Sequence, residues 1–285
     1  MERIIKSLAP TALIVAGVVV FVLGTAFMLA SDATLASNST GASSDLAQAG
    51  RWLQLVAWLC LLGAVCTAGW EAIVHSEWAA GAEIAAAALG TLLLAIGVAA
   101  FASSNGSSPS GAVTGAVGIG IWALLVLSRA ARVSLTEQGQ APAPAPPPPP
   151  QAQRAQLPPP APQHRADLWL AAAVGLFALA IGYGFTAASS AGPGVAAGVL
   201  EAAGTAAIAW SLATARSRKM LDAPVILVGL ALLAVSFLAN AIVSGLSFGT
   251  LTALGVGLTV VAAVELAGVV ALGLAAWTRV RALYP

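Results

Sequence analysis

Eight long apolar runs constrain the fold of this chain more than any other feature. They cover approximately residues 8–30, 52–74, 79–102, 111–128, 167–189, 193–214, 223–246 and 250–278. A helix of about 20 mostly apolar residues crosses a bilayer, because it satisfies its own backbone hydrogen bonds. Clusters of Ser, Gly, Asn and Pro separate the runs and are typical of turns. The pattern predicts an all-α integral membrane protein with eight transmembrane helices.

The composition supports lipid as the main surroundings of the chain. Only 8% of the 285 residues are charged and 59% are hydrophobic, whereas a soluble domain carries about 25% charged residues. The net charge is +1, and no basic patch with interleaved aromatic residues is present. We therefore expect the lipid bilayer, and not a nucleic acid, as a partner.

The distribution of basic residues predicts the orientation in the membrane. If both termini lie on one side, eleven of the twelve Lys and Arg lie there too, and only Arg51 lies opposite. Because basic loops stay on the inner side, both termini are predicted to be cytoplasmic. We expect a multi-pass protein of the bacterial cytoplasmic membrane. The less favoured alternative, a cleaved signal peptide at 8–30, conflicts with an apolar run longer than the usual signal core.

A proline-rich segment divides the chain into two groups of four runs. Residues 134–166 contain eleven of the sixteen prolines and are predicted to form an extended cytoplasmic linker. The flanking parts, 1–133 and 167–285, are each predicted to form a four-helix transmembrane bundle. PxxP spacing in the linker also suits a cytoplasmic partner domain, although a semi-rigid spacer is the favoured interpretation.

Matching residues suggest that the two halves are a parallel tandem repeat. Aligned pairs are Gly17, Gly24 and Phe27 with Gly175, Gly182 and Phe185; Trp70 with Trp210; Glu83 with Asp222; Gly90 with Gly229; and Gly118, Ser128 and Arg129 with Gly268, Thr278 and Arg279. The offset differs between helices, so the loops must differ in length. Chance matching in an Ala- and Gly-rich sequence is the alternative.

Small residues at regular spacing predict where helices pack, because helices in a bilayer associate through close contact at small side chains. The run 250–278 carries such a stripe at every fourth residue: Gly255, Thr259, Ala263, Ala267, Ala271 and Ala275. GAVTG opens the fourth run and GVAAG opens the sixth. These stripes predict tightly packed seams between helices and no wide pore.

Two glutamates, Glu201 and Glu265, are the candidate proton- or ion-binding residues. Both are predicted near the membrane midplane, and no Lys or Arg lies at that depth in any run. A charge at a helix centre costs on the order of 3 kcal/mol on insertion scales. We therefore expect at least one of the two to be protonated at neutral pH, or the pair to hold a cation or a water.

The neighbours of the two glutamates are a further prediction. Glu265 points away from the alanine stripe of its run, so a candidate neighbour is the face of 193–214 that carries Glu201, together with Ala197, Thr205 and Ala209. The repeat places Leu61 and Gly115 at the matching positions, which predicts a site in the second half alone. The alternative role is a neutral glutamic acid that donates one interhelical hydrogen bond, worth about 1 kcal/mol.

Other chemistries find little support in the sequence. Glu71, His75 and Glu77 lie close together near one turn, but three ligands from a single turn are a weak metal signal. The two histidines, His75 and His164, lie outside the runs, so no bis-histidine haem site is expected. We predict no cofactor, no metal and no catalytic residue.

These patterns lead to two functional hypotheses. The first is a non-enzymatic accessory, assembly or scaffold subunit that binds other membrane protein subunits. It is motivated by apolar bundles with small loops and no catalytic constellation. The alternative is a small proton- or cation-coupled secondary transporter that uses Glu201 and Glu265.

Overall fold

The structure, a computed structural model, describes residues 2–37, 40–74, 78–104, 108–139, 165–187, 191–215, 223–246 and 250–283. These residues form eight α-helices: α1 Glu2–Ala36, α2 Thr40–Val74, α3 Trp78–Ser103, α4 Pro109–Gly139, α5 Arg165–Phe185, α6 Ala191–Ala215, α7 Ala223–Gly245 and α8 Leu251–Leu283. Each helix is long and apolar enough to cross a membrane. The predicted all-helical class and the number of helices are confirmed for the described residues, and the eight helices fit a multi-pass membrane protein.

Several helices are longer than the apolar runs that predicted them. α1 continues to Ala36, and α2 begins at Thr40, well before the run 52–74. α4 continues to Gly139, into the predicted linker, while residues 140–164 lie outside the described residues. Polar side chains support the extra turns: Ser31 donates a hydrogen bond to the carbonyl oxygen of Ser43 at 2.8 Å. α1 and α2 continue past their apolar runs because polar side chains such as Ser31 form hydrogen bonds across the α1–α2 seam.

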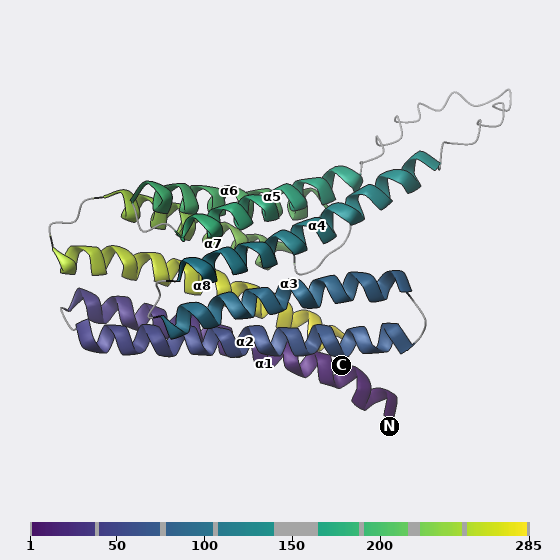
Figure 1. Cartoon of the computed structure of the whole chain (residues 1–285), viewed down its shortest axis with the longest axis horizontal. Coiled ribbons are helices and arrows are strands. Elements are labelled where there is room, and N and C mark those ends of the chain that lie inside the picture. Colours follow the sequence, from purple (N-terminus) through teal and green to yellow (C-terminus); the bar gives the residue numbers. More distant parts are fainter. Residues whose placement is uncertain are drawn as a thin grey trace, which may run out of the picture.

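The helices form one closed ring. Each helix packs on the helix before it and the helix after it, and α8 packs on α1 to close the ring (Figure 1). Within the described residues, α1 does not contact α4, and α5 does not contact α8. Two separate four-helix bundles would need those contacts, so the predicted two-bundle arrangement is not confirmed.

Neighbouring helices in the ring run antiparallel. The start of α1 and the end of α8 lie at the same end of the molecule (Figure 1). Gly24 of α1 approaches Gly50 of α2, and Gly17 approaches the later residue Ala57, as an antiparallel pair requires. The two chain ends therefore face the same side, as expected for an even number of crossings.

Glycines and alanines bring the helices close together. A Cβ atom at Gly118 of α4 would lie 2.6 Å from the carbonyl oxygen of Gly90 in α3, a distance that side chains do not tolerate. Most buried apolar residues are alanines. Because lipid is as apolar as leucine, this close backbone contact is the main source of helix association. Large apolar side chains such as Val113, Leu124 and Val260 are instead exposed, as a lipid-facing surface requires.

The predicted stripe on α8 is not one continuous seam. Gly255 and Ala275 are buried, but Ala263 and Ala267 are exposed. Residues four apart on a helix rotate by about 40° per step, so a long stripe winds around the helix. Gly255 consequently lies against the end of α1, whereas the contact with α7 is made by Gly268, which does not belong to the stripe.

Candidate functional site

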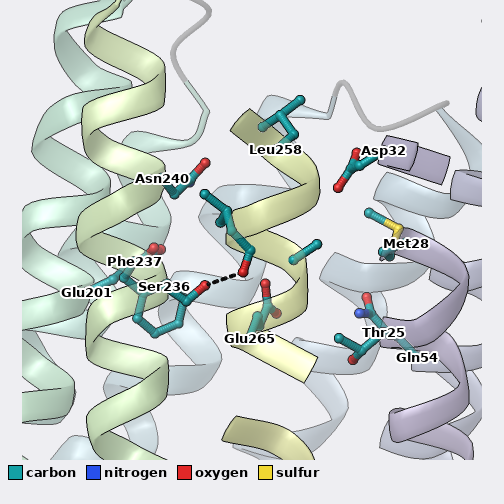
Figure 2. Close-up of a pocket in the computed structure, with 12 residues that line it drawn as sticks. Thr25, Met28, Asp32, Gln54, Glu201, Ser236, Phe237, Asn240, Leu258 and Glu265 are labelled. Carbon is teal, nitrogen blue, oxygen red and sulfur yellow. Dashed lines mark hydrogen bonds between the residues drawn. The ribbon is translucent and has the colours of Figure 1, made fainter. Parts of the chain in front are cut away.

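The ring encloses a cavity of about 190 Å³ (Figure 2). Its lining comes from α1, α2, α6, α7 and α8: Thr25, Met28, Asp32, Gln54, Glu201, Ser236, Phe237, Asn240, Leu258, Val261, Ala262 and Glu265. α2 and α6 belong to opposite parts of the ring and do not contact each other within the described residues. A cavity that touches both helices therefore lies inside the ring and not on its outer surface.

The cavity contains both glutamates selected from the sequence. Glu201 comes from α6 and Glu265 from α8. These helices are separated by α7, so the two carboxyl groups approach each other through the cavity and not through a helix–helix seam. Glu265 lies within electrostatic range of Glu201 and also of Asp32. The structure thus places three acidic side chains in the lining of one cavity.

Glu201 is the most deeply buried of these acids. Its side chain is 9% exposed, and Ala197 and Thr205 on the same face of α6 are also buried. Gly182 of α5 makes room for it, since a Cβ atom there would lie 2.9 Å from Cγ of Glu201. Among the described residues, no side chain donates a hydrogen bond to its carboxyl group. Because Glu201 lines the cavity and an acid within a membrane-spanning helix is costly, it is a candidate for ligand or proton binding.

The sequence prediction does not include Asp32, because Asp32 follows the predicted apolar run 8–30. α1 continues to Ala36, so Asp32 lies inside the helix. Thr25, Met28 and Asp32 are spaced by three and four residues and therefore share one helix face. Figure 2 shows these three side chains of α1 on the far side of the cavity from Asn240 and Phe237 of α7. The spacing of Thr25, Met28 and Asp32 along the chain is the sequence signal that could have identified Asp32.

Two hydroxyl groups of the lining have already donated their hydrogens to the backbone. Thr25 donates to the carbonyl oxygen of Phe21 at 3.0 Å, and Ser236 donates to that of Val261 at 3.3 Å. A hydroxyl has one hydrogen and two lone pairs, so only acceptor capacity remains toward the cavity. The described lining residues include no Lys, Arg or His. The cavity is therefore acidic and rich in hydrogen-bond acceptors.

The acids do not form a compact metal site. Among the described residues, no three His, Cys, Asp or Glu side chains converge as they do around a metal ion. The weak candidate at Glu71, His75 and Glu77 falls where side chains are not described. The cavity instead distributes its three acids over α1, α6 and α8.

The cavity extends from one end of the ring toward its middle. Asp32 lies four residues, about 6 Å, from the end of α1, and Asn240 lies five residues, about 8 Å, from the end of α7. Glu265 lies fourteen residues, about 21 Å, from the start of α8. These three helix ends lie opposite the end that carries the chain termini. The cavity is therefore nearer the side predicted to face outward.

Contacts in the α1–α2 seam recur in the α5–α6 seam. A Cβ atom at Gly24 would lie 3.1 Å from Cγ of Gln54, and one at Gly182 would lie 2.9 Å from Cγ of Glu201. The glycines seven residues earlier continue both seams with the same spacing (Gly17 with Ala57, Cys60 and Leu61; Gly175 with Gly204, Ala207 and Ile208). By these contacts, Gln54 has the place in α2 that Glu201 has in α6.

The α3–α4 and α7–α8 seams correspond in the same way. A Cβ atom at Gly90 would lie 3.0 Å from the carbonyl oxygen of Gly118, and one at Gly229 would lie 3.0 Å from that of Gly268. These are the pairs aligned from the sequence. Two turns further along, Gly97 packs on Gly111, and at the corresponding place Ser236 hydrogen-bonds Val261.

On the α3–α5 side of the ring, aromatic side chains occupy the interior. Gly115 of α4 has no side chain, and the ring of Tyr183 lies directly against it. Phe101 packs edge-on against Tyr183, with ring centroids 6.1 Å apart and an interplanar angle of 80°. We call Phe101 and Tyr183 the aromatic plug. The plug leaves no room for a second side chain at Gly115.

The corresponding residues on the other side line the cavity. The register of the seams relates Gly115 to Glu265, Tyr183 to Thr25 and Phe101 to Asn240. Thr25, Asn240 and Glu265 all belong to the cavity lining. Two smaller side chains thus replace the aromatic plug, and the carboxylate of Glu265 occupies part of the space.

Two sequence expectations are corrected by this arrangement. The alignment paired Glu201 with Leu61, but the contacts pair it with Gln54, two helical turns away. The site was also expected in the second half alone, whereas Asp32 and Gln54 bring the first half into the cavity. The helix-to-helix register decides such pairings, and a register shift of seven residues preserves the face of a helix, so the sequence pattern could not detect it.

The geometry of the cavity is the basis for assigning its chemistry. Comparison of the chain with protein-family models, curated proteins and solved structures found no match. The geometry is an acceptor-rich cavity inside the helix ring, with three acidic side chains and no basic side chain among the described lining residues. Such a space favours protons or cations.

Proposed function

We propose that this protein is a non-enzymatic carrier of the bacterial cytoplasmic membrane that moves protons or cations through the acidic cavity. The observation that carries the proposal is that Asp32, Glu201 and Glu265 line one cavity inside the ring. Acidic residues within membrane spans are costly and mark ion or proton pathways.

The acids are proposed to work by exchange of protons for a cation. Three carboxylates in a small space repel one another, so they are not all charged unless a cation neutralises them. Binding of a cation then releases protons, and loss of the cation lets the acids take protons up again. Glu201, buried and without a hydrogen-bond donor, is the central group in this exchange.

The proposed orientation places both termini in the cytoplasm, so that the cavity is reached from the outer side. Support comes from the basic residues of the sequence and from the position of Asp32 close to the opposite end of the ring. Alternating access would then require the inner end of the ring to open.

The direct test is charge transfer by purified protein in liposomes adsorbed on a solid-supported electrode. A jump in pH is expected to produce a current that empty liposomes lack. Glu201→Gln and Glu265→Gln should each lower it at least tenfold. The matched control is Asp167→Asn, because Asp167 is exposed in the first turn of α5, away from the cavity. Absence of both a current and a cation-driven change in lumenal pH with monodisperse wild-type protein would refute the carrier, since a one-for-one exchange of protons for a cation moves no net charge.

A second candidate is an accessory or scaffold subunit of a larger membrane complex, built as a tandem repeat. The recurring glycine contacts of the α1–α2 and α5–α6 seams favour this hypothesis, since they describe a tightly packed structural unit. The acids would then be neutral groups that stabilise the ring. In that case Glu265→Gln would lower stability without changing any current, and other membrane proteins would co-purify in mild detergent.

A further inference from the structure

We infer that the acidic cavity binds a small organic cation with several N–H donors, a guanidinium or a primary ammonium group, rather than a bare metal ion. The inference rests on the proposed carrier function and specifies its substrate class. It is carried by the donor and acceptor inventory of the lining, by the arrangement of the acids and by the cavity size.

The polar groups of the lining are mainly hydrogen-bond acceptors, so a ligand that fits them supplies its own hydrogen-bond donors. The hydroxyl hydrogens of Thr25 and Ser236 are already donated to backbone carbonyl oxygens. The carboxylates of Asp32, Glu201 and Glu265 are acceptors only when charged. The amide groups of Gln54 and Asn240 supply the N–H donors of the described lining, and each adds a carbonyl oxygen. A guanidinium group has five or six N–H donors in one plane, which suits acceptors that surround it.

A second observation is that the carboxyl group of Glu201 lacks a side-chain hydrogen-bond donor among the described residues. Its side chain is nine-tenths buried, it lines the cavity, and no described side chain donates a hydrogen bond to it. A ligand N–H would satisfy this carboxylate and neutralise it in the same step. Charge-assisted hydrogen bonds of this kind are about twice as strong as neutral ones.

The arrangement of the acids disfavours a metal ion. Among the described residues no three acidic, His or Cys ligands converge, whereas hard cations need several oxygen ligands within about 2.0–2.6 Å. Figure 2 shows Asp32 and Glu265 approaching the cavity from different helices. Separated acceptors match the separated N–H groups of a polyatomic cation.

The size and the apolar walls of the cavity agree with this ligand class. A volume of about 190 Å³ is roughly six times the share of one water molecule in liquid water. It therefore holds a few non-hydrogen atoms with one or two waters. Phe237 and Met28 contribute apolar walls, and an aromatic ring also attracts an organic cation through its π-face.

The experiment measures saturable binding of radiolabelled guanidinium to purified, full-length protein in lipid nanodiscs at neutral pH. Unlabelled methylammonium should compete. Tetramethylammonium, which has the charge but no N–H group, and Na⁺ should not compete at the same concentration. Glu201→Gln should raise the dissociation constant at least tenfold, as loss of a charge-assisted hydrogen bond predicts. Asp167→Asn should leave it unchanged.

Several results would overturn the inference. They are absence of saturable guanidinium binding, equal competition by Na⁺, equal competition by tetramethylammonium, or an unchanged dissociation constant in Glu201→Gln. If Glu201→Gln is not monodisperse, Asn240→Phe serves instead, because it fills the cavity and retains all three acids.

Different experimental results would refute the carrier proposal and the ligand inference. A proton or Na⁺ current without guanidinium binding would leave the carrier standing and remove this ligand class. Guanidinium binding in a protein that shows neither a current nor a cation-driven change in lumenal pH would support the ligand site and refute the carrier.

Discussion

The two sides of the ring interior are built on corresponding helix seams and yet have opposite chemistry. On the α3–α5 side, Phe101 and Tyr183 fill the space over Gly115. On the α7–α1 side, Asn240 and Thr25 stand at the corresponding places, and the space remains as an acid-lined cavity. The backbone arrangement therefore permits a cavity on both sides, and the volume and polarity of a few side chains decide which side has one.

The largest expected effect comes from removing the aromatic plug. Phe101→Ala should lower the free energy of unfolding by about 3 kcal/mol, because it empties a packed part of the interior. Asn240→Ala, at the corresponding place, should cost less than about 1 kcal/mol, since Asn240 already borders a cavity. Reversible unfolding in mixed detergent micelles measures both. Equal losses would show that the two sides do not differ in packing.

A smaller effect is expected from adding one methyl group beneath the plug. Gly115→Ala places a Cβ atom against the ring of Tyr183 and should cost about 1–3 kcal/mol of unfolding free energy. The control is Gly120→Ala in the same helix, where nothing lies within 4 Å of the added atom. It should be neutral or slightly stabilising. The thermal midpoints of the two variants, compared in one detergent, test this; a Gly115→Ala midpoint as high as that of Gly120→Ala would contradict the tight fit.

Filling the cavity should make the α7–α1 side of the ring interior resemble the plugged α3–α5 side. Asn240→Phe introduces the residue found at the corresponding place of the plug and leaves every carboxylate intact. Guanidinium affinity should fall at least tenfold, equivalent to about 1.4 kcal/mol, while the unfolding midpoint stays close to wild type. The measurement is nanodisc binding alongside a thermal unfolding curve. Unchanged affinity would mean that the ligand does not use this space.

The smallest expected effect comes from making the first half more acidic. Gln54→Glu places a carboxyl group in α2 where the matching seam of α6 has Glu201. A fourth acid should tighten cation binding by only a few-fold, because crowded carboxyl groups keep part of their protons. Binding across a pH series measures this. Weaker binding at every pH would indicate that Gln54 acts through its N–H donors.

Part of the site was accessible from the sequence. Glu201 and Glu265 were selected because each is a carboxyl group within an apolar run, and their predicted depths agreed. The structure places both in one cavity. Asp32 and Gln54 were not selected, because the predicted first run stopped too early and because the repeat alignment of α2 was shifted by two turns. Both errors concern register along a helix, for which composition carries little information.

The sequence by itself determined the number of helices able to cross a membrane, the helical class and the presence of acids within apolar runs, since these follow from the cost of placing polar groups in hydrocarbon. Only the tertiary structure decided that α8 closes on α1 and that one side of the interior is plugged while the other stays open. The physical reason is that lipid offers helices no hydrophobic gain for one neighbour over another. Neighbours are therefore chosen by close fit between particular small and large side chains, which exists only once the helices have met.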